Sequence, residues 1–91
     1  MFTPSDATIL ASAIRAGRVA LGWSQQELAT RADVSLPTIT RIELATTSPR
    51  VQTIGQLLNA MEQAGVSFVW TEPGKHYVMS VASPLKPARR K

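Results

Sequence analysis

The sequence predicts a mainly α fold that ends in a two-stranded β element. Two observations indicate this fold class: apolar residues recur at helical spacing up to Gly65, and beyond Gly65 they alternate with period two. A third observation, the placement of helix start and stop residues, divides the helical part into separate short helices. We expect a helical segment over residues 1–65, a β element over 66–82 and a flexible basic tail over 83–91.

The first helix is predicted from about Asp6 to Leu21. Ser5 is the expected N-cap and Gly22 the expected C-terminal stop. One face of this helix is formed by Leu10, Ile14, Gly17 and Leu21.

The stretch WSQQELATRADVSLPTITRIE contains two further helix starts. Ser24 and Glu27 have the spacing of a capping box. Asp33 and Ser35 interrupt the helix that begins there, and Ser35 caps a new one with Pro37 in its first turn, where proline is tolerated. Ile39 and Ile42 then face inward. The residues left on the outer side of this helix are Leu36, Pro37, Thr38, Thr40 and Arg41.

A fourth helix and two strands complete the prediction. The helix starts with Ser48 as cap and Pro49 at its first position, and it ends at Gly65. Its apolar stripe is Ile54, Leu57, Leu58 and Met61. The strands place Val66, Phe68 and Trp70 on one side, and Tyr77, Met79 and Val81 on one side. Pro73-Gly74 fits a tight hairpin badly, so we expect a wider loop or pairing with a strand of another chain.

Composition excludes several classes of function. The absence of cysteine rules out disulfides and thiolate sites, and no apolar run has the length of a membrane span, so we expect a cytoplasmic protein. Of the ten basic residues, four lie in the tail KPARRK, and the remaining six balance six acidic residues. The net charge of +4 therefore does not by itself establish nucleic-acid binding. The tail either keeps the protein in solution or adds phosphate contacts.

Two short helices around a sharp turn, the second with an exposed arginine, resemble the helix-turn-helix of the Xre/Cro family of phage and bacterial repressors. The matching residues lie in SQQELATRADVSLPTITRIE, and the resemblance covers roughly Arg15 to Gln63. It implies a lambda-repressor-like helical DNA-binding domain. Asp33 departs from the family, which usually has glycine in the turn.

The resemblance assigns roles to individual residues. Gln25 corresponds to a glutamine that contacts a phosphate or base edge, and the major-groove positions are Ser35, Leu36, Pro37, Thr38, Thr40 and Arg41. The phosphate contacts correspond to Thr46, Thr47 and Arg50, with Ser24 and Gln26 sharing that task. Arg18 and Glu43 correspond to an internal ion pair, which we assign to structure.

The resemblance also implies a homodimer on a palindromic double-stranded DNA operator. The expected dimer interface is formed by Val66, Phe68, Trp70, Tyr77 and Met79, because two edge strands would otherwise leave many large side chains in water. A domain of this kind followed by β structure is similar to the HipB-type antitoxins, whose partner is a HipA-type kinase toxin.

The sequence also allows two other interpretations of the helical part. The two helices could form an ordinary helical hairpin, or the chain could be a protein-interaction module with a vestigial helix-turn-helix. We expect no enzyme, because the acidic residues show no paired arrangement and glycine-rich phosphate loops are absent. We also expect no metal and no cofactor, since His76 is the single histidine.

Overall fold

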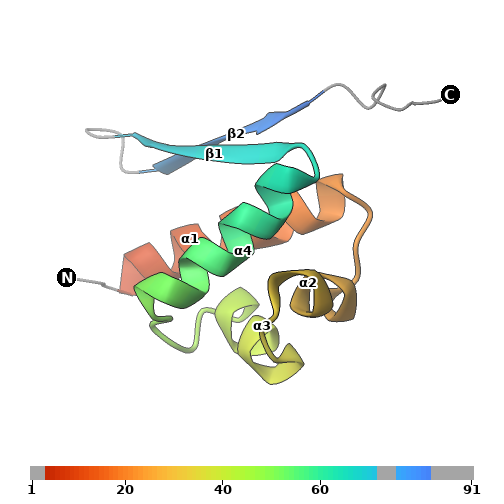
Figure 1. Cartoon of the computed structure of the whole chain (residues 1–91). Helices are drawn as coiled ribbons and strands as arrows, with labels where there is room; N and C mark the ends of the chain where they lie inside the picture. The colour runs from red at the N-terminus through yellow and green to blue at the C-terminus, as the bar shows by residue number, and fades with distance from the viewer. Residues whose placement is uncertain (1–3, 72–75, 83–91) are drawn as a thin grey trace, which may run out of the picture.

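The computed structural model describes residues 4–71 and 76–82, and the predicted fold class is confirmed. The elements in chain order are α1 (Pro4–Ala20), α2 (Gln25–Ala32), α3 (Leu36–Glu43), α4 (Val51–Gln63), β1 (Val66–Thr71) and β2 (His76–Val81). They form three layers, with the hairpin over α1 and α4, and α2 and α3 on the opposite side of these two helices (Figure 1).

The helices contribute to one hydrophobic core. Its largest fully buried side chains are Leu10, Ile14, Leu28, Ile39, Ile42, Leu57, Met61 and Val66. Because this set includes Val66 of β1, the hairpin shares the core of the helical part. Trp23 is also buried, and Arg31 lies over its ring at 4.5 Å from the ring centre, which agrees with a packing role.

α1 begins earlier than its predicted start at Asp6. Proline is tolerated at the first helical position, so the helix starts at Pro4 and Ser5 lies within the first turn instead of capping it. At the other end Gly22 has φ +72°, and the amide of Trp23 donates to the carbonyl of Arg18. Gly22 therefore ends the helix as predicted, in a left-handed turn that satisfies the last carbonyls.

α4 does not start where its sequence predicts. Ser48 and Pro49 belong to the preceding loop, and Arg50 is the N-cap, with φ −69° and ψ 151° and no side-chain cap hydrogen bond. The prediction used local capping preferences, whereas the packing of Leu57 and Met61 sets where this helix lies. The first N–H groups of α4 are consequently left for other partners.

The strands pair within the chain as an antiparallel hairpin. The register runs from Val66 opposite Val81 to Thr71 opposite His76, so residues 72–75 make the connection. This is the wider loop, one of the two arrangements expected for Pro73-Gly74. The residues of that loop and the basic tail over 83–91 lie outside the described residues.

Gly17 allows α1 to approach both α4 and the hairpin closely. A Cβ atom at this position would lie 2.8 Å from Sδ of Met61 and 2.8 Å from Cζ of Phe68. Both distances are shorter than normal van der Waals contact, so a larger residue here would force the side chains of Met61 and Phe68 to shift within a packed core.

Candidate nucleic-acid interface

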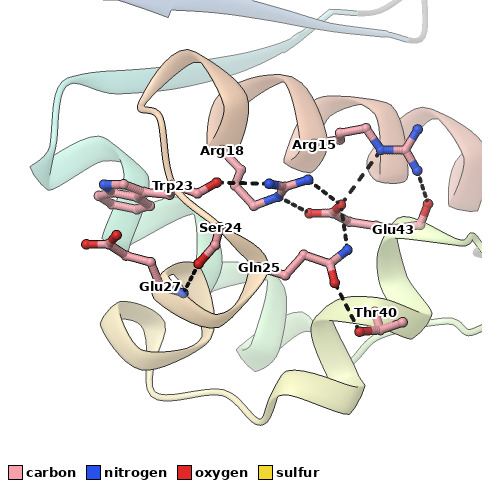
Figure 2. A network of polar contacts seen from close by, with 8 residues as sticks. All are labelled: Arg15, Arg18, Trp23, Ser24, Gln25, Glu27, Thr40 and Glu43. Atoms are coloured by element: carbon pink, nitrogen blue, oxygen red, sulfur yellow. Dashed lines mark hydrogen bonds and ion pairs between the residues drawn. The ribbon is translucent and has the colours of Figure 1, made fainter.

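A buried carboxylate attaches α3 to the rest of the domain. Glu43, the last residue of α3, is 3% exposed, and its Oε2 and Oε1 accept from Nε and Nη2 of Arg18 at 2.8 and 3.0 Å. Figure 2 shows this pair from close by; Arg18 also donates from Nη1 to the carbonyl of Trp23. The predicted ion pair of Arg18 and Glu43 is thus present, in a two-point geometry that fixes the orientation of α3 against α1.

The pKa values of this pair follow from its surroundings. Burial raises the pKa of Glu43, but the hydrogen bonds from Arg18 and Gln25 and the nearby guanidinium groups outweigh burial, so the net pKa is lowered. The hydrogen bond to Glu43 raises the pKa of Arg18. Both groups are therefore charged at neutral pH.

Gln25 joins the same network, which the sequence analysis missed. Its Nε2 donates to Oε1 of Glu43 at 3.0 Å, and its Oε1 accepts from Oγ1 of Thr40 at 3.2 Å (Figure 2). These two bonds use one of the two N–H groups and one lone pair of the amide, so the predicted contact of Gln25 with a phosphate or a base stays a prediction. In this structure Gln25 and Thr40 link the start of α2 to the middle of α3.

Arg15 is a second network member that the sequence analysis missed. Its Nη2 donates to the main-chain carbonyl of Glu43 at 2.8 Å, and its Nε lies 3.7 Å from Oε1 of the same residue. One of the last carbonyls of α3 therefore has a cationic partner. Arg15 lies one turn before Arg18 on α1, and this spacing was the signal available in the sequence.

The helix-turn-helix itself is built by local caps. Oγ of Ser24 accepts from the amide of Glu27 at 3.0 Å, and Oγ of Ser35 accepts from the amide of Thr38 at 3.3 Å. Between the two helices Asp33 has φ 58° and ψ 46°, the left-handed conformation expected for this turn. In a full capping box the carboxylate of Glu27 would also accept from the amide of Ser24. Within the described residues this carboxylate instead accepts from Arg31, four residues further along α2.

Gln56 of α4 stabilises this turn from outside the helix-turn-helix. Its Nε2 lies 3.2 Å from the carbonyl oxygen of Ala32 and 3.3 Å from that of Asp33. The end of α2 is thereby capped by a side chain distant in sequence. Local patterns contained no signal for this contact.

The predicted DNA-contacting side chains fall into two groups. Several are hydrogen-bonded within the chain: Gln26 with Thr30, Ser35 with Thr38, and Thr46 with the carbonyl of Arg41. Within the described residues, by contrast, the side chains of Arg41 and Arg50 form no hydrogen bond or ion pair with the protein. The exposed surface of α3 therefore offers two apolar residues, Leu36 and Pro37, and one unpaired cation, Arg41.

Arg41 and Arg50 border a hollow between α3 and the start of α4. Its volume is about 410 Å³, and it is lined by Thr38, Arg41, Thr47, Ser48, Pro49, Arg50 and Thr53. Two arginines, four hydroxyl-bearing residues and the uncapped start of α4 thus line one space. This combination of donors and positive charge suits an anion such as a phosphate group.

The predicted dimer residues occupy different places. Val66 is fully buried, and Phe68 and Met79 pack against the same core. A second chain is not needed to bury Val66, and Phe68 and Met79 are partly covered within the chain, because the alternation of the strands turns them toward its helices. The dimer interface itself stays a prediction. The side chains of Trp70 and Tyr77 lie outside the described residues.

The outer face of the hairpin carries one exposed apolar pair, next to the paired serines Ser67 and Ser80. Val69 and Val78 are opposite each other in the register and are 58% and 45% exposed. Exposed apolar side chains of this kind are typical of surfaces that contact another protein.

Other kinds of site lack support within residues 4–71 and 76–82. No group of three or more histidine, cysteine, aspartate or glutamate side chains in these ranges is arranged to hold a metal ion. In the same ranges no helix has the length and apolar character needed to cross a membrane.

Comparison with known proteins identifies the fold family. The family model for the helix-turn-helix matches residues 14–63, more than half of the chain. No curated protein matches the sequence. The matched range contains the two capped helices, the left-handed turn and the buried ion pair described above. The chain therefore belongs to the Xre/lambda-repressor-like helix-turn-helix family and is a DNA-binding transcription regulator.

Proposed function

We propose that the protein is a homodimeric, sequence-specific repressor that binds a palindromic double-stranded DNA operator and regulates its own gene. The observation that carries this proposal is the exposed α3, which presents the unpaired Arg41 beside a cationic hollow. A regulator of this kind acts on chromosomal DNA, so we place it in the cytoplasm, at the nucleoid.

In the proposed complex α3 enters the major groove. The planar guanidinium group of Arg41 donates two parallel hydrogen bonds to O6 and N7 of a guanine, a contact that provides about 1 to 3 kcal/mol of discrimination. Arg50, Thr47 and the free N–H groups at the start of α4 hold a neighbouring phosphate. Without the four basic residues of the tail, the formal net charge of the chain is zero. DNA binding in this proposal therefore depends on where these groups are placed and not on the net charge.

The Glu43 network contributes by holding α3 in place. A shift of the helix would move Arg41 away from its base and from the phosphate hollow together. Gln25 and Thr40 brace the interior side of α3, and in this proposal they support the interface and do not contact the DNA directly.

The proposed dimer uses the hairpin. Its support is the exposed pair of valines on the outer face, Val69 and Val78. Sedimentation of the full chain should show a dimer at micromolar concentration, and Val69→Ser with Val78→Ser should shift it to the monomer. Val19→Ser, which alters an exposed valine of α1, is the matched control and should leave the dimer intact. A wild-type monomer would contradict this part of the proposal.

Footprinting on the DNA upstream of the protein's own coding region tests the function. We expect one protected palindrome at moderate salt, with half-sites separated by about one turn of DNA. An unprotected upstream region would favour the second candidate.

The second candidate is a protein-interaction module, and the exposed valine face of the hairpin is the observation that favours it. The hairpin lies on the opposite side of α1 and α4 from α3 (Figure 1), so a protein bound to the hairpin would leave α3 free. The partner proposed from resemblance is a HipA-type kinase toxin, which would make the chain its antitoxin. A kinase-like neighbouring gene whose product co-purifies with this chain would support that role, and its absence would argue against it.

A further inference from the structure

The exposed first turn of α3 is apolar. Leu36 and Pro37 are the first two residues of the helix, and both side chains are exposed, Leu36 by 36%. Neither side chain carries a hydrogen-bond donor or acceptor. On a helix that faces DNA, this apolar tip has to contact something other than a polar base edge.

Polar groups near the tip are already used by the protein. Ser35 and Thr38 share a hydrogen bond of 2.7 Å between their hydroxyl oxygens, and Ser35 also accepts from the amide of Thr38. The amide of Gln25, at the start of α2, is held by Glu43 and Thr40. These polar groups are oriented by bonds within the protein, whereas the apolar side chains of Leu36 and Pro37 are exposed to solvent.

The surroundings distinguish the tip from the phosphate site. A hollow of about 440 Å³ adjoins Leu36, and its lining consists of Gln26, Ala29, Thr30, Asp33, Val34, Ser35 and Leu36. The carboxylate of Asp33 in this lining repels a phosphate, whereas the cationic hollow with Arg41 and Arg50 attracts one. Pro37 and Arg41 lie four residues apart on one face of α3, so the apolar tip continues the surface that Arg41 presents.

We propose that the tip of Leu36 and Pro37 recognises the 5-methyl group of a thymine in the operator. The thymine methyl is the apolar feature of base edges in the major groove, and it distinguishes thymine from the other bases there. The inference deepens the proposed function and rests on it, because it presumes that α3 lies in the major groove. It makes Leu36 a specificity-determining residue next to Arg41.

Replacing thymine by deoxyuridine tests this proposal. The operator is first selected from random DNA with the full chain, and each thymine is then replaced singly by deoxyuridine, which keeps every hydrogen-bonding group and loses only the methyl. We expect the dissociation constant to rise about fourfold at one thymine per half-site, as burial of one methyl group predicts, and about 15-fold when both half-sites are changed. Replacement at the other thymines should have little effect.

Variants of the protein test whether the deoxyuridine effect arises from Leu36 and Pro37. Leu36→Ala should weaken binding to the thymine operator and reduce the deoxyuridine effect to near unity, with the helical circular dichroism unchanged. Leu44→Ala removes an exposed leucine just beyond the other end of α3 and should keep the wild-type fourfold effect. Pro37→Ala gives a second test that does not depend on the folding of the leucine variant.

The outcomes separate the inference from the proposed function. A selected operator whose affinity is unchanged by deoxyuridine at every position overturns the inference and leaves sequence-specific binding intact. A deoxyuridine effect that persists in both Leu36→Ala and Pro37→Ala also overturns it. If no operator is selected, the proposed function fails, and this inference fails with it.

Discussion

Replacement of Glu43 by glutamine should destabilise the domain severely. The carboxylate is 3% exposed, and it holds Arg18, whose side chain is only 16% exposed. Removing one partner of such a pair leaves an uncompensated charge in a dry environment, which costs about 3 to 5 kcal/mol. Because Arg18 retains some contact with water, we expect about 3 kcal/mol, a large part of the 5 to 15 kcal/mol that typically holds a domain together.

Urea denaturation followed by circular dichroism measures this loss. Glu27→Gln is the matched control, since it breaks an exposed ion pair with Arg31 and should change the free energy of unfolding by about 0.5 kcal/mol or less. The double variant Arg18→Met with Glu43→Gln should recover part of the loss, because no buried charge is then left without its partner. A loss below about 1 kcal/mol for Glu43→Gln would refute the reasoning that this pair fixes α3.

The same comparison has a defined pH dependence. The folded-state pKa of Glu43 is lowered from its ordinary value of 4.5, so the carboxylate contributes stability that is fully present above that value. This stability is lost as the pH falls through the lower, folded-state pKa. The difference in stability between the wild type and Glu43→Gln should therefore be constant near neutral pH and should shrink below about pH 4. A difference that stays constant into strong acid would contradict the assignment.

Four further substitutions test the packing and the turns. Gly17→Ala should lower the free energy of unfolding, because overpacking against Met61 costs about 1 to 3 kcal/mol and exceeds what alanine gains over glycine in a helix. Gly55→Ala is the matched control: it has open space around it and should stabilise the domain by about 0.5 to 1 kcal/mol. Ala45→Gly should raise the midpoint of urea denaturation slightly, because Ala45 has φ 59°, and an unchanged or lower midpoint would count against strain there. Gln56→Met should cost about 1 kcal/mol, since it removes the donor that caps α2, and an unaltered urea midpoint would show that this cap is unimportant.

Local chemistry was enough to predict the helix-turn-helix. Ser24 and Ser35 cap their helices as predicted, and Asp33 takes the left-handed conformation of the turn. These features depend on residues close together in sequence, so the pattern of side chains determines them. The start of α4 was predicted wrongly by the same reasoning, because Ser48 and Pro49 remain in the loop and no side chain caps that helix.

Tertiary contacts account for the rest of what was missed. Gln25 carries two hydrogen-bonding groups, and the sequence did not indicate that they would meet Thr40 and Glu43. Gln56 reaches the turn from a helix more than twenty residues away. The large side chains of the hairpin suggested a dimer, but Phe68 packs against the helices of its own chain. In each case the partner is set by how the elements pack, and spacing along the chain does not encode it.

Selection of bound sequences from random DNA, performed in parallel with the wild type and Arg41→Ala, tests the central claim most directly. The claim is that α3 contacts base edges and that Arg41 determines the base at one position of each half-site. The wild type should select a palindrome with a strongly preferred guanine, and Arg41→Ala should select the same palindrome with that position relaxed. An identical preference at every position in the two selections would contradict the account.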